Sequence, residues 1–381
     1  MAQYDFIILG AGAAGLMLAR AMAEDPWFES SQILIIEKEI KNQNDRTWCF
    51  WEEDNGPFDE ILNQRWSQIL FKGKRLNRKM DISPFSYKLI RSRDFYKEQI
   101  RLIQKSPNIE FLQAAVLKVE EKSDGVNIQT SEKTVLGDRV FSSLFDYKDI
   151  LSQKKYPVLQ QHFVGWFVET DKPVFDDKAP TFMDFSIPQR GNTRFMYVLP
   201  FSSSRALLEY TLFSSQPLEK HEYEDAIASY LEQHYDNTNY KILEKEHGNI
   251  PMTCFDFESQ NTDRLVHIGT AGGWAKPSTG YTFKNSMKFS SKLVRHIKKD
   301  MPLRKFSVKS RYWYYDLLLL DILDKNNHLG SAIFEAMFRN RSPQLILKFL
   351  DENCSWYQDL WIITGCPILP FTRALWGRIF K

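Results

Sequence analysis

The apolar positions of this 381-residue chain follow two patterns: short continuous runs, and strand-like runs that alternate with turn-forming clusters in the middle of the chain. Near-continuous apolar runs at residues 5–9, 33–37 and 265–269 are typical of short buried strands. The stretch at residues 16–23, which follows the first run, predicts a helix. Strand, helix and strand in immediate succession predict a parallel βαβ unit at the start of the chain.

The middle of the chain alternates strand-like runs with turn-forming clusters. Residues 162–168, 194–199 and 206–212 are the clearest runs, and together they predict an antiparallel sheet. A helix is expected at residues 222–235, between strands of that sheet. The final part of the chain is expected to be mostly helical. Its apolar segments are residues 317–323, 333–338 and 344–350.

A glycine-rich turn joins the first strand to the first helix. Gly10 permits a tight turn, Gly12 lets the backbone approach a pyrophosphate, and Gly15 allows the helix to pack closely on the strand. The helix N-terminus offers backbone N–H groups to phosphates. Glu37 ends the second strand, where an acid accepts hydrogen bonds from a ribose and disfavours the 2′-phosphate of NADP. The candidate residues of this FAD or NAD site are Gly10, Gly12, Ala13, Ala14, Gly15, Glu37 and Lys38.

A second glycine-rich segment, at residues 269–281, decides between FAD and NAD. It follows the strand at 265–269, and a helix is expected to begin near Thr282. The segment resembles the second FAD-binding segment of the p-hydroxybenzoate hydroxylase-like flavoproteins, whose loop and helix N-terminus cover the flavin ring. FAD is therefore the expected cofactor. The candidate residues here are Gly269, Ala271, Gly272, Thr279, Gly280 and Tyr281.

Together these segments predict an α/β fold. We expect an FAD/NAD(P)-binding Rossmann-like domain with an inserted antiparallel-sheet substrate domain and a helical C-terminal region. The FAD-binding domain is expected to be discontinuous, over residues 1–60, 85–150 and 255–300. The other two parts are the substrate domain at 61–84 and 155–250, and the helical region at 301–381.

The charges are distributed unevenly along the chain. The 50 Lys and Arg nearly balance the 48 Asp and Glu, yet residues 281–381 hold 17 basic and 8 acidic residues. The most basic part is residues 284–311, which carries no recognised nucleic-acid-binding motif, so we expect an anionic membrane surface as its partner and no nucleic acid. Four of its basic residues recur at helical spacing: Lys284, Lys288, Lys292 and Arg295.

Other features bound the location of the protein. The four cysteines are widely separated, which predicts neither a disulfide framework nor a metal site. The N-terminus lacks the features of a signal peptide, and no apolar run reaches the ~18–20 residues that span a bilayer. Residues 311–315 and 317–320 combine aromatic and aliphatic side chains as an interfacial segment does. We expect a cytoplasmic protein that is peripherally associated with the inner face of the cell membrane.

Segments along nearly the whole chain, taken in order, resemble the bacterial lycopene β-cyclases. The most specific are Arg-Thr-Trp-Cys-Phe-Trp at 46–51, Leu-Leu-Glu-Tyr-Thr at 207–211 and Pro-Ser-Thr-Gly-Tyr at 277–281. The resemblance implies a non-redox cyclisation of the ψ ends of lycopene, or of another acyclic carotene, to β-ionone rings, giving γ-carotene and β-carotene. It also implies that FAD acts in its reduced form and that NAD(P)H is its indirect reductant.

Glu209 matches the acid of the family's Leu-Leu-Glu-type motif, so the resemblance implies that it is the general acid. Protonating an alkene at neutral pH requires an acid that keeps its proton, and burial among apolar residues raises the pKa of a carboxyl group. Alternation along the strand places Glu209 on the same face as Leu207 and Thr211. The opposite face should hold Leu208, Tyr210 and Leu212.

Aromatic faces can stabilise the resulting carbocation, and an anionic reduced flavin would add to this effect. The aromatic candidates are Trp48, Phe50, Trp51, Phe185, Tyr197 and Tyr281. Tyr210 stands where many relatives have a second acid, which argues against a two-carboxylate relay through that neighbour. Lys276 replaces a His that many relatives carry before the proline. Asp184 and Glu169 are further acids that we expect to be solvated or structural.

Two other interpretations of these residues stay open. The first is an FAD-dependent monooxygenase or reductase that acts on a large apolar isoprenoid at the membrane. The second is a flavoprotein that binds a lipid without turnover. Only a cyclase would return a cyclic isomer of its substrate with unchanged mass.

Overall fold

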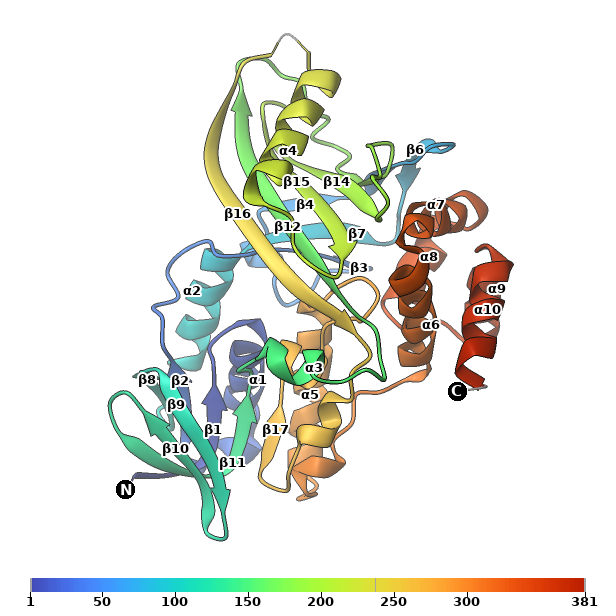
Figure 1. Cartoon of the computed structure of the whole chain (residues 1–381). Helices are drawn as coiled ribbons and strands as arrows, with labels where there is room; N and C mark the ends of the chain where they lie inside the picture. The colour runs from blue at the N-terminus through green and yellow to red at the C-terminus, as the bar shows by residue number, and fades with distance from the viewer. Residues whose placement is uncertain (1, 237, 380–381) are drawn as a thin grey trace. The chain divides into compact units, whose positions relative to one another are not determined.

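A computed structural model describes residues 2–236 and 238–379. The chain divides into two compact units (Figure 1). The first unit contains Met1–Trp48, Arg91–Tyr156 and Cys254–Ser310. The second unit contains Cys49–Ile90, Pro157–Thr253 and Arg311–Lys381.

The first unit is built on a mixed seven-stranded sheet with the strand order β8-β2-β1-β11-β10-β9, and β17 pairs with β11. Strands β8, β2, β1, β11 and β17 run parallel to one another. Strand β10 pairs antiparallel with both β11 and β9. The expected strands at 5–9, 33–37 and 265–269 are confirmed as β1, β2 and β17. The strands are β1 (Ala2–Leu9), β2 (Ile33–Glu37), β8 (Ile109–Gln113), β9 (Val116–Lys122), β10 (Gly125–Thr130), β11 (Thr134–Ser142) and β17 (Leu265–His267).

Helices cover this sheet and position its glycine-rich turn. Helix α1 confirms the helix expected at 16–23, and it packs against both α2 and α5. Apolar side chains of β1 and β2, among them Ile7, Leu9, Leu34 and Ile36, form a buried cluster. This explains why the two runs are almost wholly apolar. The helices are α1 (Ala13–Ala23), α2 (Ser92–Ile103), α3 (Tyr147–Leu151) and α5 (Phe283–Ile297).

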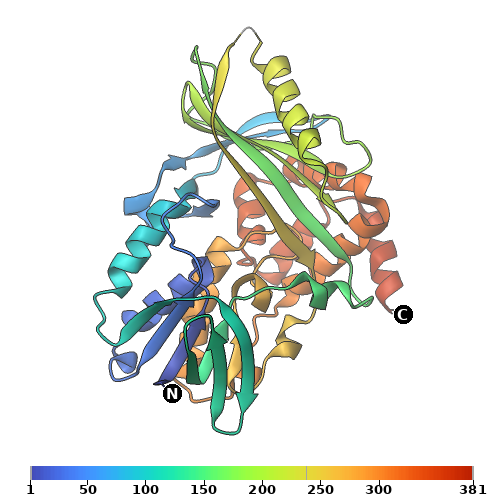
Figure 2. The same cartoon turned by 60° about the vertical axis from the view of Figure 1, so that its left-hand side comes forward.

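The second unit is built on a seven-stranded sheet with the order β16-β12-β15-β14-β13-β5-β6. Its strand pairs are antiparallel except for β13 with β5, so the antiparallel sheet expected from the middle of the chain is confirmed. Helix α4 (Lys220–His234) packs on one face of the sheet (Figure 2). The strands are β5 (Gln68–Lys72), β6 (Asn77–Asp81), β12 (Val158–Thr170), β13 (Thr181–Asp184), β14 (Arg194–Ser202), β15 (Arg205–Ser214) and β16 (Tyr240–Thr253).

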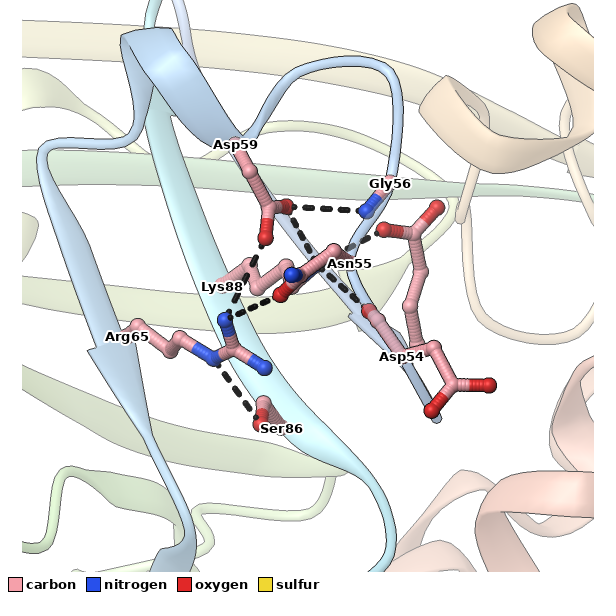
Figure 3. Close-up of polar contacts among 8 residues, drawn as sticks. Asp54, Asn55, Gly56, Asp59, Arg65, Ser86 and Lys88 are labelled. Atoms are coloured by element: carbon pink, nitrogen blue, oxygen red, sulfur yellow. Dashed lines mark hydrogen bonds and ion pairs between the residues drawn. The ribbon is translucent and has the colours of Figure 1, made fainter.

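A small sheet, β3-β7-β4, is held by a buried lysine. The Lys88 side chain is fully buried, and its Nζ lies 2.9 Å from Glu52 Oε2 and 2.5 Å from Asp59 Oδ1. It also donates to the Asp54 carbonyl at 3.1 Å, and Arg65 forms a second ion pair with Asp59 (Figure 3). A buried ammonium group persists only when it is paired in this way. The strands are β3 (Thr47–Glu52), β4 (Gln64–Trp66) and β7 (Ser86–Arg91).

The C-terminal part of the second unit is helical, as expected, and the apolar segments at 317–323, 333–338 and 344–350 lie in α6, α7 and α8. None of the described helices combines the length and the apolarity needed to cross a membrane. The helices are α6 (Arg311–Asn326), α7 (Gly330–Asn340), α8 (Pro343–Leu350), α9 (Trp356–Ile363) and α10 (Ile368–Ile379). Short 3-10 helices are η1 (Pro26–Phe28), η2 (Asp59–Ile61), η3 (Phe257–Gln260), η4 (Gly269–Gly272), η5 (Leu303–Lys305) and η6 (Asn327–Leu329).

The prediction that the start of α6 is an interfacial segment is wrong for those of its residues that are buried. Tyr312, Leu317 and Leu320 are buried in the second unit. The Tyr312 hydroxyl donates to Asp359 at 3.0 Å and accepts from the Cys354 N–H at 3.0 Å. Composition cannot distinguish an aromatic helix that faces lipid from one that packs on other helices.

Candidate functional site

The first glycine-rich turn has the geometry of a close-approach loop. Gly10 has φ +96°, a conformation that favours glycine. A Cβ on Gly15 would lie 2.0 Å from the Gly10 carbonyl oxygen, so α1 packs directly on the turn. A Cβ on Gly12 would meet no atom within 4 Å. Protein packing therefore requires glycine at 10 and 15, whereas at Gly12 the missing side chain leaves open space beside the backbone.

The N-terminus of α1 is available to an anion. Its N-cap is Gly12, which provides no side-chain cap, so the N–H groups of Ala13 and Ala14 face no capping oxygen. The Glu37 carboxylate lies beside the turn, where Oε2 accepts a hydrogen bond from the Ala11 N–H at 2.7 Å. Lys38 is exposed and forms an ion pair with Glu39 at 3.2 Å. The sequence-predicted residues of the first motif therefore gather at this turn, except that Lys38 points to solvent.

The second glycine-rich segment lies against the first one. Gly269 has φ +59°, and a Cβ there would lie 2.9 Å from Cβ of Ala14 in the first turn of α1. The Ile268 N–H donates to the Ser142 carbonyl at 2.8 Å, which ties the segment to the end of β11. Ala271 and Gly272 follow in η4. Two motifs that are far apart in the sequence thus form one corner of the first unit.

The loop at residues 276–281 is closed by its own backbone. The Lys276 N–H donates to the Tyr281 carbonyl at 2.9 Å, and the Gly280 N–H donates to the Lys276 carbonyl at 2.8 Å. Gly280 has φ +70°, which this tight turn requires. The Lys276 side chain is buried.

Buried polar atoms in the first unit fit a bound group. The Thr279 hydroxyl is buried and has no hydrogen-bond partner among the described residues. The same holds for both amide atoms of Gln99, a fully buried residue on α2. Each such atom costs about 1–3 kcal/mol unless a partner is supplied. A polar, phosphate-bearing ligand such as FAD would supply partners, so the donor set fits this cofactor.

Gln99 was not among the sequence-predicted residues. It lies between Phe95 and Ile103 at spacings of four, on the buried face of an amphipathic helix. A glutamine at an apolar position of such a helix was the available signal. It was weak, because the sequence alone does not show that the amide remains without a protein partner.

Trp48 belongs to an aromatic cluster of the first unit. Its ring lies 5.1 Å from Phe95, 5.9 Å from Tyr96 and 5.2 Å from Phe283, measured between ring centroids. The cluster joins the start of β3 to α2 and α5. Trp48 therefore packs against α2, the helix that carries Gln99, and against α5.

In the second unit, Glu209 occupies the centre of the large sheet. It lies on β15, directly opposite Gly165 of β12 and Tyr197 of β14. The Thr211 hydroxyl donates to Glu209 Oε1 at 2.6 Å, so the two side chains share a face, as alternation predicts. The other face of β15 packs on α4 and includes Leu208, Tyr210 and Leu212.

The surroundings of Glu209 favour its protonated form. Burial and, after it, the negative charge of Glu246 raise the pKa of Glu209 to about 8, and the hydrogen bond from Thr211 offsets part of the shift. The residue nevertheless remains partly exposed. A carboxyl group that keeps its proton near neutral pH and is still accessible can act as a general acid.

The remaining aromatic candidates differ in their surroundings. Tyr197 lies opposite Glu209 on the sheet. Trp51 donates from Nε1 to the Leu347 carbonyl at 3.0 Å, and Phe185 stacks on Phe334 at 5.7 Å between ring centroids. Phe50 is buried. The contacts of Trp51 and Phe185 are those of core packing, so the structure brings Tyr197 to the acid and not these two.

Asp184 and Glu169 both have structural partners. Asp184 is fully buried and accepts hydrogen bonds from Ser186 and from the Tyr230 hydroxyl, the latter at 2.8 Å. Lys72 Nζ lies 3.4 Å from Asp184 Oδ2 and forms an ion pair with it. Glu169 forms an ion pair with Arg205 on the surface. Neither acid is needed to explain the site around Glu209.

Known proteins resemble this chain over most of its length. A family model described as "Lycopene cyclase protein" matches residues 5–376. A lycopene beta-cyclase of Pantoea ananas is 24% identical over 304 residues, covering 76% of this chain and 74% of that protein. A chloroplastic/chromoplastic lycopene beta cyclase of Capsicum annuum is 29% identical over 318 residues, covering 73% and 57%. A flavoprotein/dehydrogenase structure from Cytophaga hutchinsonii aligns with a TM-score of 0.66 at 12% identity, covering 99% and 100%.

Proposed function

Because the chain belongs to the lycopene cyclase family, we propose that it is a lycopene β-cyclase, which converts the ψ ends of lycopene or another acyclic carotene to β-ionone rings. The observation that carries the proposal is Glu209, a carboxyl group whose pKa is raised to about 8 in the middle of a mostly apolar strand. Such a group can protonate an alkene at neutral pH. γ-Carotene and β-carotene are the expected products.

The reaction is redox-neutral and begins with proton transfer from Glu209 to a terminal carbon–carbon double bond. The resulting carbocation is attacked by a second double bond, which closes a six-membered ring. Loss of a proton from the ring then gives the β-ionone product, so that one proton enters and one leaves. Tyr197, opposite Glu209, presents an aromatic ring on the same face of the sheet, where it can stabilise the cation.

The cofactor proposed for the first unit is FAD. The turn at Gly10 to Gly15, the Glu37 carboxylate, the Thr279 hydroxyl and the Gln99 amide would hold it. When bound in its reduced form, FAD would supply negative charge that stabilises a nearby cation. We further propose that NAD(P)H reduces the flavin indirectly.

Anaerobic turnover tests the proposal. The protein is incubated with reduced FAD and lycopene. The extracted carotenoids are then separated, and their masses are determined by mass spectrometry. A cyclic product with the mass of lycopene supports the cyclase. A product that has gained an oxygen atom or two hydrogens would instead identify a monooxygenase or a reductase, and unchanged lycopene would identify a binding protein. An active Glu209→Gln variant would contradict the role of Glu209.

A carotene is bilayer-soluble, so we also propose peripheral membrane association at the inner face of the cell membrane. The basic region at 284–311 supports this, because Lys288, Lys292 and Arg295 lie exposed on α5 while Phe289 and Leu293 are buried. An exposed apolar surface on α9 and α10 of the second unit supports it independently. Its side chains are 52–69% exposed: Trp356, Tyr357, Leu360, Trp361, Ile368, Leu369, Trp376 and Ile379.

Basic residues accompany this apolar surface. The Arg341 guanidinium lies 4.0 Å from the centroid of the Trp361 ring. Arg341 also lines a recess together with Arg78, Lys79 and Arg339. Exposed tryptophans beside basic side chains are typical of surfaces that bind anionic lipid.

Vesicle sedimentation tests the membrane proposal. We expect the protein to pellet with vesicles that contain anionic lipid and less with zwitterionic ones. Trp356→Ser with Trp361→Ser should reduce binding to both kinds of vesicle, whereas Lys288→Gln with Lys292→Gln should reduce only the anionic preference. Trp27→Ser, a change at an exposed tryptophan of the first unit, is the matched control. Unchanged binding in both double variants would contradict the assignment of these surfaces.

A further inference from the structure

A second carboxyl group lies beside Glu209, and it comes from a distant part of the sequence. Glu246 on β16 pairs with Gly165 of β12, and Gly165 pairs on its other side with Glu209 of β15. Directly opposite residues of antiparallel strands share a face of the sheet. The two glutamates therefore flank one glycine on the same face. Glu246 is 7% exposed.

Gly165 makes the approach of these side chains possible. Strands lie about 4.8 Å apart, so the two glutamate backbones are separated by about 10 Å across β12. A Cβ on Gly165 would lie 2.8 Å from Leu207 Cδ1 and 3.1 Å from Glu246 Cγ. The Glu246 side chain therefore extends over Gly165, into the space that a side chain at position 165 would occupy.

The groups described around the pair include a hydroxyl, a phenol and a thiol. Thr211 donates its hydroxyl hydrogen to Glu209, and Tyr197 is the residue opposite Glu209 on β14. Cys49 of β3 is close to both acids. Burial raises the pKa of its thiol, a hydrogen bond with Tyr87 lowers it, and the charges of Glu209 and Glu246 raise it further. The negative charge acting on Glu209 is that of Glu246.

We propose that Glu209 and Glu246 form a carboxyl pair that retains one proton across Gly165, with Glu246 as a positioning residue that keeps the proton on Glu209. Two carboxylates in one buried site do not both ionise readily, because like charges disfavour the second ionisation. Glu246 supplies a second acid from another strand, whereas the strand motif of this chain has Tyr210 at the position where many relatives have one. This inference rests on the proposed cyclase function for its catalytic meaning.

The pair also accounts for the return of the proton. Transfer of the Glu209 proton to the alkene breaks the O–H bond, forms a C–H bond and leaves two neighbouring carboxylates. Their mutual repulsion favours recapture of one proton from solvent or from the cyclised cation. The site is then ready for the next ring.

The pH profile of the Glu246→Gln variant tests the proposal. Without the neighbouring charge, the pKa of Glu209 falls, and the alkaline limb of the activity profile moves to lower pH. We expect a shift of at least about one pH unit, which means about a tenfold loss of activity on the alkaline side. Activity on the acid side of the limb is retained. Glu246→Asp should restore the limb. Glu169→Gln, on the strand β12 that also carries Gly165 but ion-paired with Arg205, should leave the limb unchanged.

Infrared titration separates this proposal from the cyclase function. The carboxyl band that disappears in Glu209→Gln reports the protonation of Glu209 without substrate. That band should be lost at lower pH in Glu246→Gln than in the unmodified protein, even if the protein cyclises no carotene. An unchanged titration of the band would overturn the proposal. A uniform loss of activity at every pH with an unshifted limb would also overturn it, because a merely structural role has that effect.

Discussion

Replacing Glu209 by glutamine should stabilise the folded protein near neutral pH. Glutamine is neutral at every pH and keeps an oxygen that can accept the hydrogen bond from Thr211, which is 2.6 Å long in the native protein. The native carboxyl group must keep its proton in the folded state but loses it on unfolding. The variant removes this difference while it conserves the size of the side chain.

The magnitude follows from the two pKa values. The carboxyl has a pKa of about 8 when folded and an ordinary value of 4.5. The raised value means that the folded state binds the proton more tightly, so native stability falls as the pH rises from 4.5 towards 8. Each pH unit in that window costs the native protein about 1.4 kcal/mol relative to the variant. Near pH 7 the difference is on the order of 3 kcal/mol, and near pH 4 it is close to zero.

Denaturant unfolding at several pH values measures this difference. The free energies of unfolding of the native protein and of Glu209→Gln should converge in acid and separate steadily up to about pH 8. Glu169→Gln, which removes a partly exposed, ion-paired carboxylate from the same sheet, should show no such divergence. A gap that does not depend on pH, or a variant that is less stable than the native protein at neutral pH, would refute the reasoning.

Three further changes test other parts of the structure. Gly12→Ala should change the unfolding free energy of the cofactor-free protein by no more than about 1 kcal/mol, because the added Cβ meets no atom. The same variant should weaken FAD binding in a fluorescence titration. Gly15→Ala should instead destabilise the fold itself, because its Cβ would lie 2.0 Å from a carbonyl oxygen. Lys88→Met should lower the unfolding free energy by about 3–5 kcal/mol, since it leaves the carboxylates of Glu52 and Asp59 without their buried partner, and a loss below about 1 kcal/mol would contradict this. Thr279→Val should stabilise the cofactor-free protein slightly and weaken FAD binding, and unchanged FAD affinity would argue against a role for the hydroxyl in holding the cofactor.

The sequence predicted the elements whose patterns are local. The strands at the start of the chain, the helix after Gly15 and the antiparallel middle could be read because apolar runs, glycine spacing and alternation are properties of neighbouring residues. The same alternation correctly placed Glu209 and Thr211 on one face.

Residues that depend on long-range pairing were not predicted. Glu246 meets Glu209 only because β16 and β15 flank β12 in a particular register, which no local pattern encodes. Lys88 is buried between two acids through strand pairing, and no local pattern marks it. The aromatic start of α6 was assigned to lipid, because its composition does not show that Tyr312 packs against the end of α8 and α9.

Cyclisation in D2O tests the central claim, that an enzyme carboxyl group protonates the substrate, most directly. The Glu209 proton exchanges with solvent, so each ring that forms should carry one deuterium that the substrate lacked. Mass spectrometry of the anaerobic product is therefore expected to show one deuterium per ring, and Glu209→Gln should form no labelled product. A cyclic product without deuterium, or one that has gained oxygen, would contradict the account.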